Sequence, residues 1–401
     1  MTSHDADRIV AYLREQRPAM VDLLQRLALA ESPSDDPAAV GRAFSILSAE
    51  LERAGLRVRR LQGRASAGVL YARPREKARG LPWQLLVGHC DTVWPVGTVR
   101  QMPVRVEGEV VRGPGVFDMK GGLVQMVHAL RAVRDLGLTP PARPVAVINS
   151  DEEVGSPGST PLIRCLARGA VRAFVLEPAF GRSGKLKTAR KAVGSFTVTI
   201  KGRAAHAGIN PEEGASAVLE LSHQVQRLFA LNDPARGVSV NVGTIDGGLR
   251  PNVVAPEVRA TVDVRVPTAA DGAAVEAAIR GLRPVNPLTT IQVEGGIEHP
   301  PMEPSPRNQA LWRLARHLGR RLGLELEQAA VGGASDGNTT SQYTATLDGL
   351  GAVGDGAHAA HEQVETARMA ERCALLVLLL LAPAGPDEWP VRPEAPAEGR
   401  P

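Results

Sequence analysis

The chain of 401 residues has few cysteines, few aromatic residues and no apolar run long enough to span a bilayer. Its three cysteines, Cys90, Cys165 and Cys373, are an odd number, which argues against a disulfide framework and favours a reducing, cytoplasmic location. The late apolar run CALLVLLLLAPA is too short for a transmembrane helix and fits the buried face of a last helix. The first residues carry acidic side chains and no apolar signal-peptide core, so we expect no membrane association.

An excess of one charge is also missing. The 47 basic and 43 acidic residues are spread along the chain, without a long block of lysine and arginine. Nucleic-acid-binding domains instead collect basic residues in a patch or stripe. We therefore expect no nucleic-acid partner.

Two different patterns of apolar residues along the chain indicate two domains, and the length of the chain also favours two domains. Continuous apolar runs alternate with helical segments, as in an α/β domain whose mostly parallel sheet is covered on both faces. The expected strands are 84–87, 145–149, 174–176 and 324–330, and the expected helices are 7–27, 121–136, 308–322 and 365–381.

Between residues 192 and 300 the strands alternate apolar with polar side chains, as in a sheet with one solvated face. Strands at 196–200, 238–245, 258–266 and 290–293, with helices at 215–231 and 273–282, give the order β-α-β-β-α-β of a ferredoxin-like sandwich. We expect a catalytic domain made of residues 1–190 and 301–383, an inserted ferredoxin-like domain at 191–300, and a disordered proline-rich tail at 384–401.

Polar residues follow several of the expected strands. Ligands of open parallel sheets bind just beyond the carboxyl ends of the strands, so these side chains can converge. A further histidine, His358, precedes the last helix. The strand-end residues are His89, Asp91, Asp118, Asp151, Glu152, Glu153 and Glu177.

Two imidazoles and three carboxylates suit zinc or a neighbouring divalent metal, and a carboxylate can bridge two ions. Two Zn²⁺ ions would balance Asp118, Glu153 and Glu177 together with a bridging hydroxide, whereas one ion would leave carboxylates uncompensated. We therefore expect two zinc ions per chain, with Co²⁺ or Mn²⁺ as alternatives. Asp91 lies two residues from His89 in an extended segment, so we expect it to orient that ring.

Glu152 and Glu153 are adjacent and cannot face the metals in the same way. One should coordinate a metal, and the other should carry a proton from water to a leaving amine.

Eight motifs occur in the order GHCDTV, GPGVFDMKGGL, SDEEVGSPGS, LEP, GRAAHAG, RPNVVAP, GGASDGN and GAHAAHEQV. Together they resemble the di-zinc aminoacylase and glutamate carboxypeptidase family of metallopeptidases over about residues 20 to 380. The resemblance implies that Asp118 bridges two zinc ions, one held by His89 and Glu177 and the other by Glu153 and His358.

The resemblance also makes Glu152 the general base and implies a cis peptide bond at Asp118-Met119. His361 competes with His358 as the second imidazole ligand. His358 is preferred because the ligand of the family precedes a glutamate by four residues, here Glu362.

In the family the inserted domain forms a dimer contact and sends a histidine into the active site of the partner. This implies a homodimer, with His206 stabilising the oxyanion. The matching substrate-facing positions are Asn252 and Arg265, with the backbone N–H groups of the loop that contains Gly333 and Ser335.

One departure concerns the carboxylate of the released amino acid, which relatives often bind through an arginine near the end of the insert. Here His299 stands at that position, and a histidine makes one hydrogen bond instead of a bidentate pair. A strong preference for a C-terminal glutamate is therefore expected only if Arg250 or Arg190 takes over the role of the missing arginine.

These observations predict a di-zinc carboxypeptidase or aminoacylase-type hydrolase. It would release an amino acid from an N-acyl amino acid or a short peptide, by attack of a metal-bound hydroxide with Glu152 as base. The alternative is a biosynthetic deacylase of acetylornithine or succinyl-diaminopimelate type. A metal-stabilised binding protein without turnover is disfavoured, because binding alone would not need Glu152.

Overall fold

The computed structural model describes residues 3–75, 80–385 and 389. The chain divides into two compact units, of which the first contains residues 1–188, 304–330 and 335–401, and the second contains residues 189–303 and 331–334. The expected insert, 191–300, falls within the second unit. The expected disordered tail lies outside the described residues except for 384, 385 and Trp389, and Trp389 is buried and donates a hydrogen bond to the Pro383 carbonyl.

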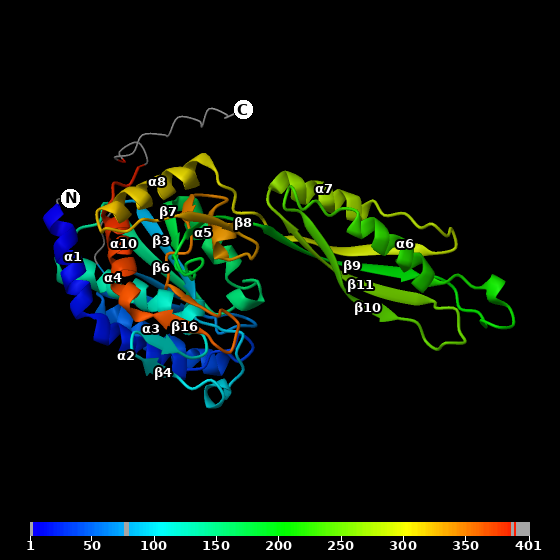
Figure 1. Ribbon diagram of the computed structural model, residues 1–401, viewed down its shortest axis with the longest axis horizontal. Coiled ribbons are helices and arrows are strands. Elements are labelled where there is room, and N and C mark those ends of the chain that lie inside the picture. The colour runs from blue at the N-terminus through cyan, green and yellow to red at the C-terminus, as the bar shows by residue number, and fades with distance from the viewer. Residues whose placement is uncertain (1–2, 76–79, 386–388, 390–401) are drawn as a thin grey trace. The chain divides into compact units, whose positions relative to one another are not determined.

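A six-stranded sheet forms the centre of the first unit (Figure 1). The neighbours β6, β3, β7 and β14 run parallel, while β1 and β2 form an antiparallel edge. The mostly parallel sheet predicted from the apolar runs is therefore confirmed. In sheet order the strands are β1 (Leu56–Leu61), β2 (Val69–Pro74), β6 (Arg143–Asn149), β3 (Trp83–His89), β7 (Ala170–Val175) and β14 (Ala345–Leu347).

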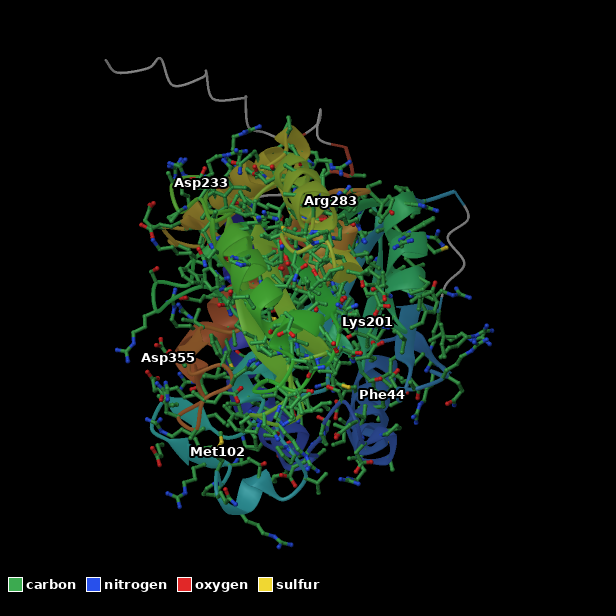
Figure 2. The ribbon with its side chains drawn as sticks, turned by 90° about the vertical axis from the view of Figure 1, so that its right-hand side faces the viewer. Phe44, Met102, Lys201, Asp233, Arg283 and Asp355 are labelled. Atoms are coloured by element: carbon green, nitrogen blue, oxygen red, sulfur yellow. The ribbon has the colours of Figure 1, made fainter. Side chains whose placement is uncertain are left out.

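Both faces of this sheet are buried because its strands are apolar on both sides. Leu85 and Val87 of β3 pack with α5 on one face, and Leu86 belongs to the larger core on the other face. In that larger core α10 packs against α4, and Phe44 of α3 (labelled in Figure 2) is also buried. The helices of this unit are α1 (Ser3–Glu15), α2 (Arg17–Leu29), α3 (Pro37–Arg53), α4 (Gly121–Asp135), α5 (Thr160–Gly169), α8 (Pro306–Arg320), α9 (Asp336–Thr340) and α10 (Met369–Leu381).

The single opening helix predicted at 7–27 is wrong, because the structure has two helices, α1 and α2, that meet at Gln16. Pro18 is the second residue of α2. Proline cannot donate a backbone hydrogen bond, and its ring would clash with the carbonyl four residues earlier, so a helix restarts at a proline more readily than it continues through one.

A second, smaller sheet of the first unit was not predicted. Its strands, in sheet order, are β15 (Gly354–Asp355), β16 (Gln363–Glu365), β5 (Val110–Arg112) and β4 (Arg105–Glu107). The pairing of β16 with β5 brings the segment that contains His358 beside the segment that contains Asp118.

The second unit is a four-stranded antiparallel sheet with the strand order β10-β11-β9-β12 and two helices (Figure 1). Burial alternates along β11, where Val258 to Val266 face the core at every second position. Lys201, labelled in Figure 2, is the last residue of β9. The elements are β9 (Ala192–Lys201), α6 (Ala217–Phe229), β10 (Ser239–Gly247), β11 (Glu257–Val266), α7 (Ala269–Arg280) and β12 (Thr290–His299).

This element order is β-α-β-β-α-β, which is that of a ferredoxin-like sandwich. Two further strands, β8 (Leu186–Arg190) and β13 (Gln328–Val331), pair with each other. Among the described residues, no helix combines the length and apolar character needed to cross a membrane.

Candidate metal centre

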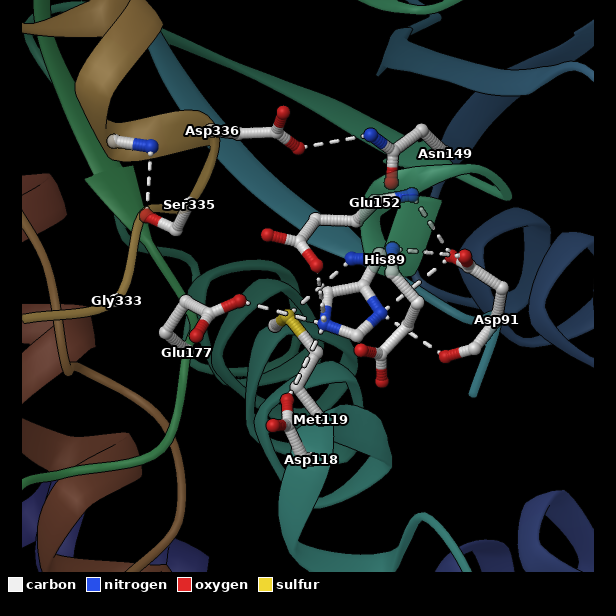
Figure 3. Close-up of polar contacts among 12 residues, drawn as sticks. His89, Asp91, Asp118, Met119, Asn149, Glu152, Glu177, Gly333, Ser335 and Asp336 are labelled. Carbon is white, nitrogen blue, oxygen red and sulfur yellow. Dashed lines mark hydrogen bonds and ion pairs between the residues drawn. The ribbon is translucent and has the colours of Figure 1, made fainter. Parts of the chain in front are cut away.

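Three adjacent strands of the central sheet end at the candidate site. His89 is the last residue of β3 and pairs in register with Asn149, the last residue of β6. Glu152 and Glu153 follow β6 in a short turn, and Glu177 follows β7 on the other side of β3. The imidazole of His89 therefore lies in the middle of the group, as Figure 3 shows.

The Nε2 atom of His89 faces three carboxylates. It lies 3.3 Å from Oδ1 of Asp118, 3.4 Å from Oε1 of Glu177 and 3.9 Å from Oε2 of Glu152. The His89 side chain is buried, and its Nε2 atom has no hydrogen-bond partner among the described residues. A buried nitrogen that faces carboxylates without hydrogen-bonding to them is a candidate metal ligand.

The second imidazole, His358, lies at the other end of the Asp118 carboxylate. Its Nε2 atom is 3.4 Å from Oδ2 of Asp118 and 3.1 Å from Oε2 of Glu153. The two oxygens of Asp118 therefore face two different histidines. The backbone of His358 has a φ of 59°, a left-handed conformation that residues other than glycine rarely adopt and that is found at functional sites.

The donor atoms fit two divalent metal ions. Two groups that share His89 are alternative positions for one ion, namely His89 with Glu152 and Glu177, and His89 with Asp118 and Glu153. The contacts of His358 with Asp118 and Glu153 supply donor atoms for a second ion. Ligand atoms of a tetrahedral zinc site, with bonds of about 2.0–2.1 Å, lie roughly 3.3 Å apart, and the contacts of Asp118 with the two histidines are 3.3 and 3.4 Å long. Nitrogen and carboxylate ligands suit zinc, and also manganese or cobalt.

The electrostatics of the site also favour cations. Burial lowers the pKa of His89, but the close carboxylates of Asp118, Asp91 and Glu177 outweigh burial and raise that pKa well above 6.5. Contacts with Asp118 and Glu153 raise the pKa of His358 to about 10. Burial raises the pKa of Asp118, yet the two histidines more than compensate and hold it below its usual value. Positive charge is therefore stabilised wherever it is placed among these carboxylates.

Asp91 makes more contacts in the site than the single contact with His89 that the sequence predicted. His89 Nδ1 lies 3.0 Å from the backbone carbonyl oxygen of Asp91 and 3.5 Å from its carboxylate, so the carbonyl makes the closer contact with the ring. The carboxylate accepts hydrogen bonds from the Ser34 hydroxyl and from the backbone N–H groups of Glu152 and Glu153. Asp91 thus positions both the ring of His89 and the turn that carries the two glutamates.

Glu152 is placed to handle a proton. Burial, and then the charges of Glu177, Asp336 and Glu153, raise its pKa well above 4.5 against the opposing effect of His89. A carboxylate whose pKa is raised binds a proton more readily, which a general base requires. Glu152 nevertheless belongs to one of the two ligand groups, so its role as base rather than ligand stays a prediction.

The side-chain roles of three residues of the site were not predicted from the sequence. Lys187 on β8 is buried with its Nζ atom 3.8 Å from Oε2 of Glu177. Asp336 accepts a hydrogen bond from Asn149, which Figure 3 shows, and another from Ser156, and burial raises its pKa to about 7. Glu362 was used only to choose between two histidines, yet its carboxylate is buried against the backbone that carries Asp118. A buried acid or lysine has no sequence signature, because its burial depends on distant segments.

The peptide bond between Asp118 and Met119 is cis, as the resemblance implies. Ser335 is buried at the start of α9, where its hydroxyl donates to Asp348 and its backbone N–H donates to Asn338. A substrate contact through this N–H would have to displace the bond to Asn338.

The other predicted substrate contacts lie in the second unit. His206 and Asn252, far apart in sequence, are brought together where residues 205–207 pair with residues 252–254, and both are exposed. Arg265 forms a bidentate ion pair with Asp263. His299 ends β12 and is partly buried, and the Gly333 carbonyl accepts a hydrogen bond from the Arg190 guanidinium.

Comparisons with known proteins agree with this geometry. The model of peptidase family M20/M25/M40 matches residues 85–382. Carboxypeptidase G2 from Pseudomonas sp. (strain RS-16) is 32% identical over 254 residues, which are 63% of this chain and 60% of that protein. Acetylornithine deacetylase from Myxococcus xanthus is 30% identical over 54% of this chain and 59% of its own length. The chain therefore spans about three fifths of the length of these curated relatives.

Solved structures share the fold. Aminopeptidase PepT from Bacillus cereus ATCC 10987 superimposes with a TM-score of 0.74 at 20% identity, over 91% of this chain and 98% of that one. The Bacillus subtilis YXEP protein, described as a dinuclear metal binding peptidase of the M20 family, has a TM-score of 0.65 at 11% identity, over 92% and 98% of the two chains. The family expected from the motifs is thus the family that matches, and the chain belongs to peptidase family M20/M25/M40.

Proposed function

We propose that the protein is a metal-dependent amide hydrolase that releases an amino acid from an N-acyl amino acid or a short peptide with a free C-terminal carboxylate. The observation that carries the proposal is the Asp118 carboxylate, whose two oxygens face His89 and His358, with the Glu152 carboxylate beside the same imidazole of His89. The similarity to carboxypeptidase G2 supports the carboxypeptidase-type substrate.

In this proposal His89 and Glu177 would hold one divalent ion, Glu153 and His358 would hold the other, and Asp118 would be a ligand shared by both. Zinc fits the nitrogen and carboxylate donors, and Co²⁺ or Mn²⁺ can occupy the same ligand set. When bound, the two ions supply Lewis acidity that polarises the scissile carbonyl and lowers the pKa of water.

Glu152 accepts the proton of the attacking water and delivers it to the nitrogen of the leaving amino acid. Its raised pKa suits both halves of this transfer. Asp91 keeps Glu152 in place through the backbone N–H of that residue.

We further propose that the second unit forms a homodimer contact, through which His206 of one chain serves the active site of the other. The Nδ1 atom of His206 accepts a hydrogen bond from the Gly208 N–H, so the neutral ring carries its proton on Nε2 and can donate it to a carbonyl oxygen. Exposed apolar side chains on α6 and on the edge strand β10, namely Val218, Leu219, Phe229 and Ile245, support such a contact. The three free cysteines support a cytoplasmic location.

A deacylase of acetylornithine type is the second candidate. Acetylornithine deacetylase is among the relatives, and His299 replaces the arginine expected of a carboxypeptidase that selects glutamate. The two candidates select on opposite halves of the substrate, so a substrate panel separates them.

The test combines metal analysis with hydrolysis. We expect about two zinc ions per chain, and release of amino acids from a panel of N-acyl amino acids and dipeptides that a chelator abolishes and added zinc restores. A rate of hydrolysis that depends mainly on the amino acid would favour a carboxypeptidase. A rate that depends mainly on the acyl group would favour a deacylase. Less than one ion per chain together with no release would refute the proposal.

A further inference from the structure

We propose that Glu362 is a positioning residue, which sets the Asp118 carboxylate between His89 and His358 by holding the backbone of residues 115–118. This inference rests on the proposed function, because it takes Asp118 to be the ligand shared by both ions. Glu362 does not contact substrate in this proposal and acts only through Asp118.

The carboxylate of Glu362 is buried and accepts four hydrogen bonds. Its Oε1 atom accepts the backbone N–H groups of Phe117 and Asp118 at 2.9 and 3.0 Å. Its Oε2 atom accepts the backbone N–H of Gly115 at 2.8 Å and the indole N–H of Trp94 at 2.9 Å. One side chain therefore fixes the backbone immediately before and at the bridging carboxylate, and also the loop that follows His89.

The pairing of two strands that are far apart in sequence places Glu362 beside residues 113–118. Gln363 of β16 pairs with Arg112 of β5, and the Gly113 N–H donates to the Glu362 backbone carbonyl. The strand β5 then leads directly into residues 113–118. The side chain of Glu362 is consequently held beside that loop by the backbone as well as by its own hydrogen bonds.

Glu362 also links the segment that carries His358 to the loop that carries Asp118. It lies four residues after His358, which contacts Oδ2 of Asp118, so one short segment carries both an imidazole and the anchor of the bridging residue. Gly115 in the anchored loop has a φ of 71°, and a Cβ atom there would lie 2.5 Å from Cγ2 of Thr92. The loop is therefore packed too tightly against the segment after His89 for its backbone to shift freely.

The pattern of donors requires a carboxylate and not an amide. All four groups that reach Glu362 are N–H donors, two on each oxygen. A glutamine has one acceptor oxygen, and its NH₂ group would face the other two N–H groups. The substitution Glu362→Gln keeps the shape of the side chain but breaks two of the four hydrogen bonds whichever way the amide is turned.

The experiment measures zinc affinity by competition with a chelator, in the full-length wild type, in Glu362→Gln and in the control Glu365→Gln. Glu365 lies three residues after Glu362, at the end of β16, where it pairs with Val110, and its substitution removes the same charge. We expect a 10- to 100-fold loss of zinc affinity in Glu362→Gln, the range typical of residues that hold metal ligands, and wild-type affinity in the control. The visible absorption of the Co²⁺-loaded protein should also change, since it reports the arrangement of ligands around the ion.

The outcomes separate this inference from the proposed function. If the wild type binds zinc and Glu362→Gln binds it equally well with the same Co²⁺ spectrum, Glu362 is only a structural residue and the inference is wrong. If the wild type itself binds no zinc, the proposed function fails and the inference fails with it.

Should Glu362→Gln not fold, hydrogen exchange of the metal-free wild type tests the same point. The amides of Gly115, Phe117 and Asp118 should be protected, because Glu362 holds them without help from a metal. Exchange of these amides at the rate of an open loop would overturn the inference.

Discussion

The backbone nitrogen of Glu153 lies 3.2 Å from Oδ2 of Asp91, so the turn after β6 is hydrogen-bonded to the end of β3. The same carboxylate accepts the N–H of Glu152 and lies beside the ring of His89. Asp91 thereby sets the distance between the first imidazole and the two adjacent glutamates.

Replacing Asp91 by asparagine should weaken metal binding. Asparagine keeps one acceptor oxygen, but its NH₂ group would face an N–H or hydroxyl donor, and the negative charge near His89 would be lost. We expect the zinc concentration for half-maximal hydrolysis to rise about 10- to 100-fold. Ser34→Ala is the matched control, since it removes one donor to Asp91 but leaves the charge, and should change this concentration less. Equal effects of both substitutions would contradict the positioning role.

Replacing Glu152 by glutamine should separate catalysis from metal binding. The variant cannot take a proton from water, so kcat should fall about 10²- to 10⁴-fold, while the zinc content and KM stay close to wild type. In the comparison variant Glu153→Gln the zinc content itself should fall. Loss of zinc in Glu152→Gln would instead assign Glu152 to the ligand group of His89 and Glu177.

Removal of metal should destabilise the first unit. Asp118, Glu152, Glu153 and Glu177 lie close together, and without metal ions their negative charges are compensated by protonated histidines and by Lys187. Zinc at 100 times its dissociation constant should stabilise the protein by about 2.7 kcal/mol, measured as a rise in Tm by calorimetry. Calcium, which prefers six to eight oxygen ligands, should raise Tm less. A Tm that is insensitive to zinc would show that the site does not bind zinc in the folded state.

His128 on α4 should make stability depend on pH. It is buried in the helical core, neither of its ring nitrogens has a hydrogen-bond partner among the described residues, and burial together with Arg131 lowers its pKa to about 4. As the pH falls, the unfolded chain takes up the proton near pH 6.5 and the folded protein only near pH 4. The contribution of neutral His128 to stability is therefore fully present above about pH 6.5. As the pH falls to 4, the free energy of unfolding decreases by up to about 3 kcal/mol.

The variant His128→Leu tests this dependence. Urea unfolding of the metal-free protein should give a free energy of unfolding that falls less between pH 8 and pH 5 in the variant than in the wild type. At pH 8 the histidine is neutral in both the folded and the unfolded state. The difference in free energy of unfolding between wild type and variant at this pH therefore measures the change in packing alone. Parallel pH profiles would show that His128 is not the residue responsible.

The strand ends could be predicted because buried parallel strands are short apolar runs, and the polar residue that follows each run stands out. His89, Glu177 and the pair Glu152 and Glu153 were found in this way, and the structure brings them together. The small sheet could not be predicted, since β15 and β16 contain two and three residues and such strands show no periodicity. The roles of Lys187 and Glu362 depend on contacts between distant segments, which no local pattern records. The break at Pro18, by contrast, was visible in the sequence and should have divided the first helix.

His299 offers a test of substrate selection in the second unit. Burial and the nearby Arg265 lower the pKa of His299, although Glu298 acts in the opposite direction, so the ring is neutral at pH 7.5 and above. A neutral imidazole donates a single uncharged hydrogen bond, whereas an arginine makes a bidentate, charge-assisted pair with a carboxylate. Hydrogen bonds to charged groups contribute about 1.5–3 kcal/mol, which corresponds to at least about tenfold in binding.

We therefore expect His299→Arg to raise the ratio of kcat/KM for an N-acyl amino acid to kcat/KM for its carboxamide analogue about tenfold at pH 8. The wild-type ratio should rise only as the pH falls below 6.5 and His299 becomes charged, and the ratio of the arginine variant should stay constant with pH. His299→Gln, an uncharged control, should match the wild type at pH 8. If the arginine variant left the ratio unchanged, the substrate carboxylate would be bound elsewhere. Arg250 would then be the better candidate, because the Arg190 guanidinium already donates to the carbonyl groups of Gly333 and Ala334.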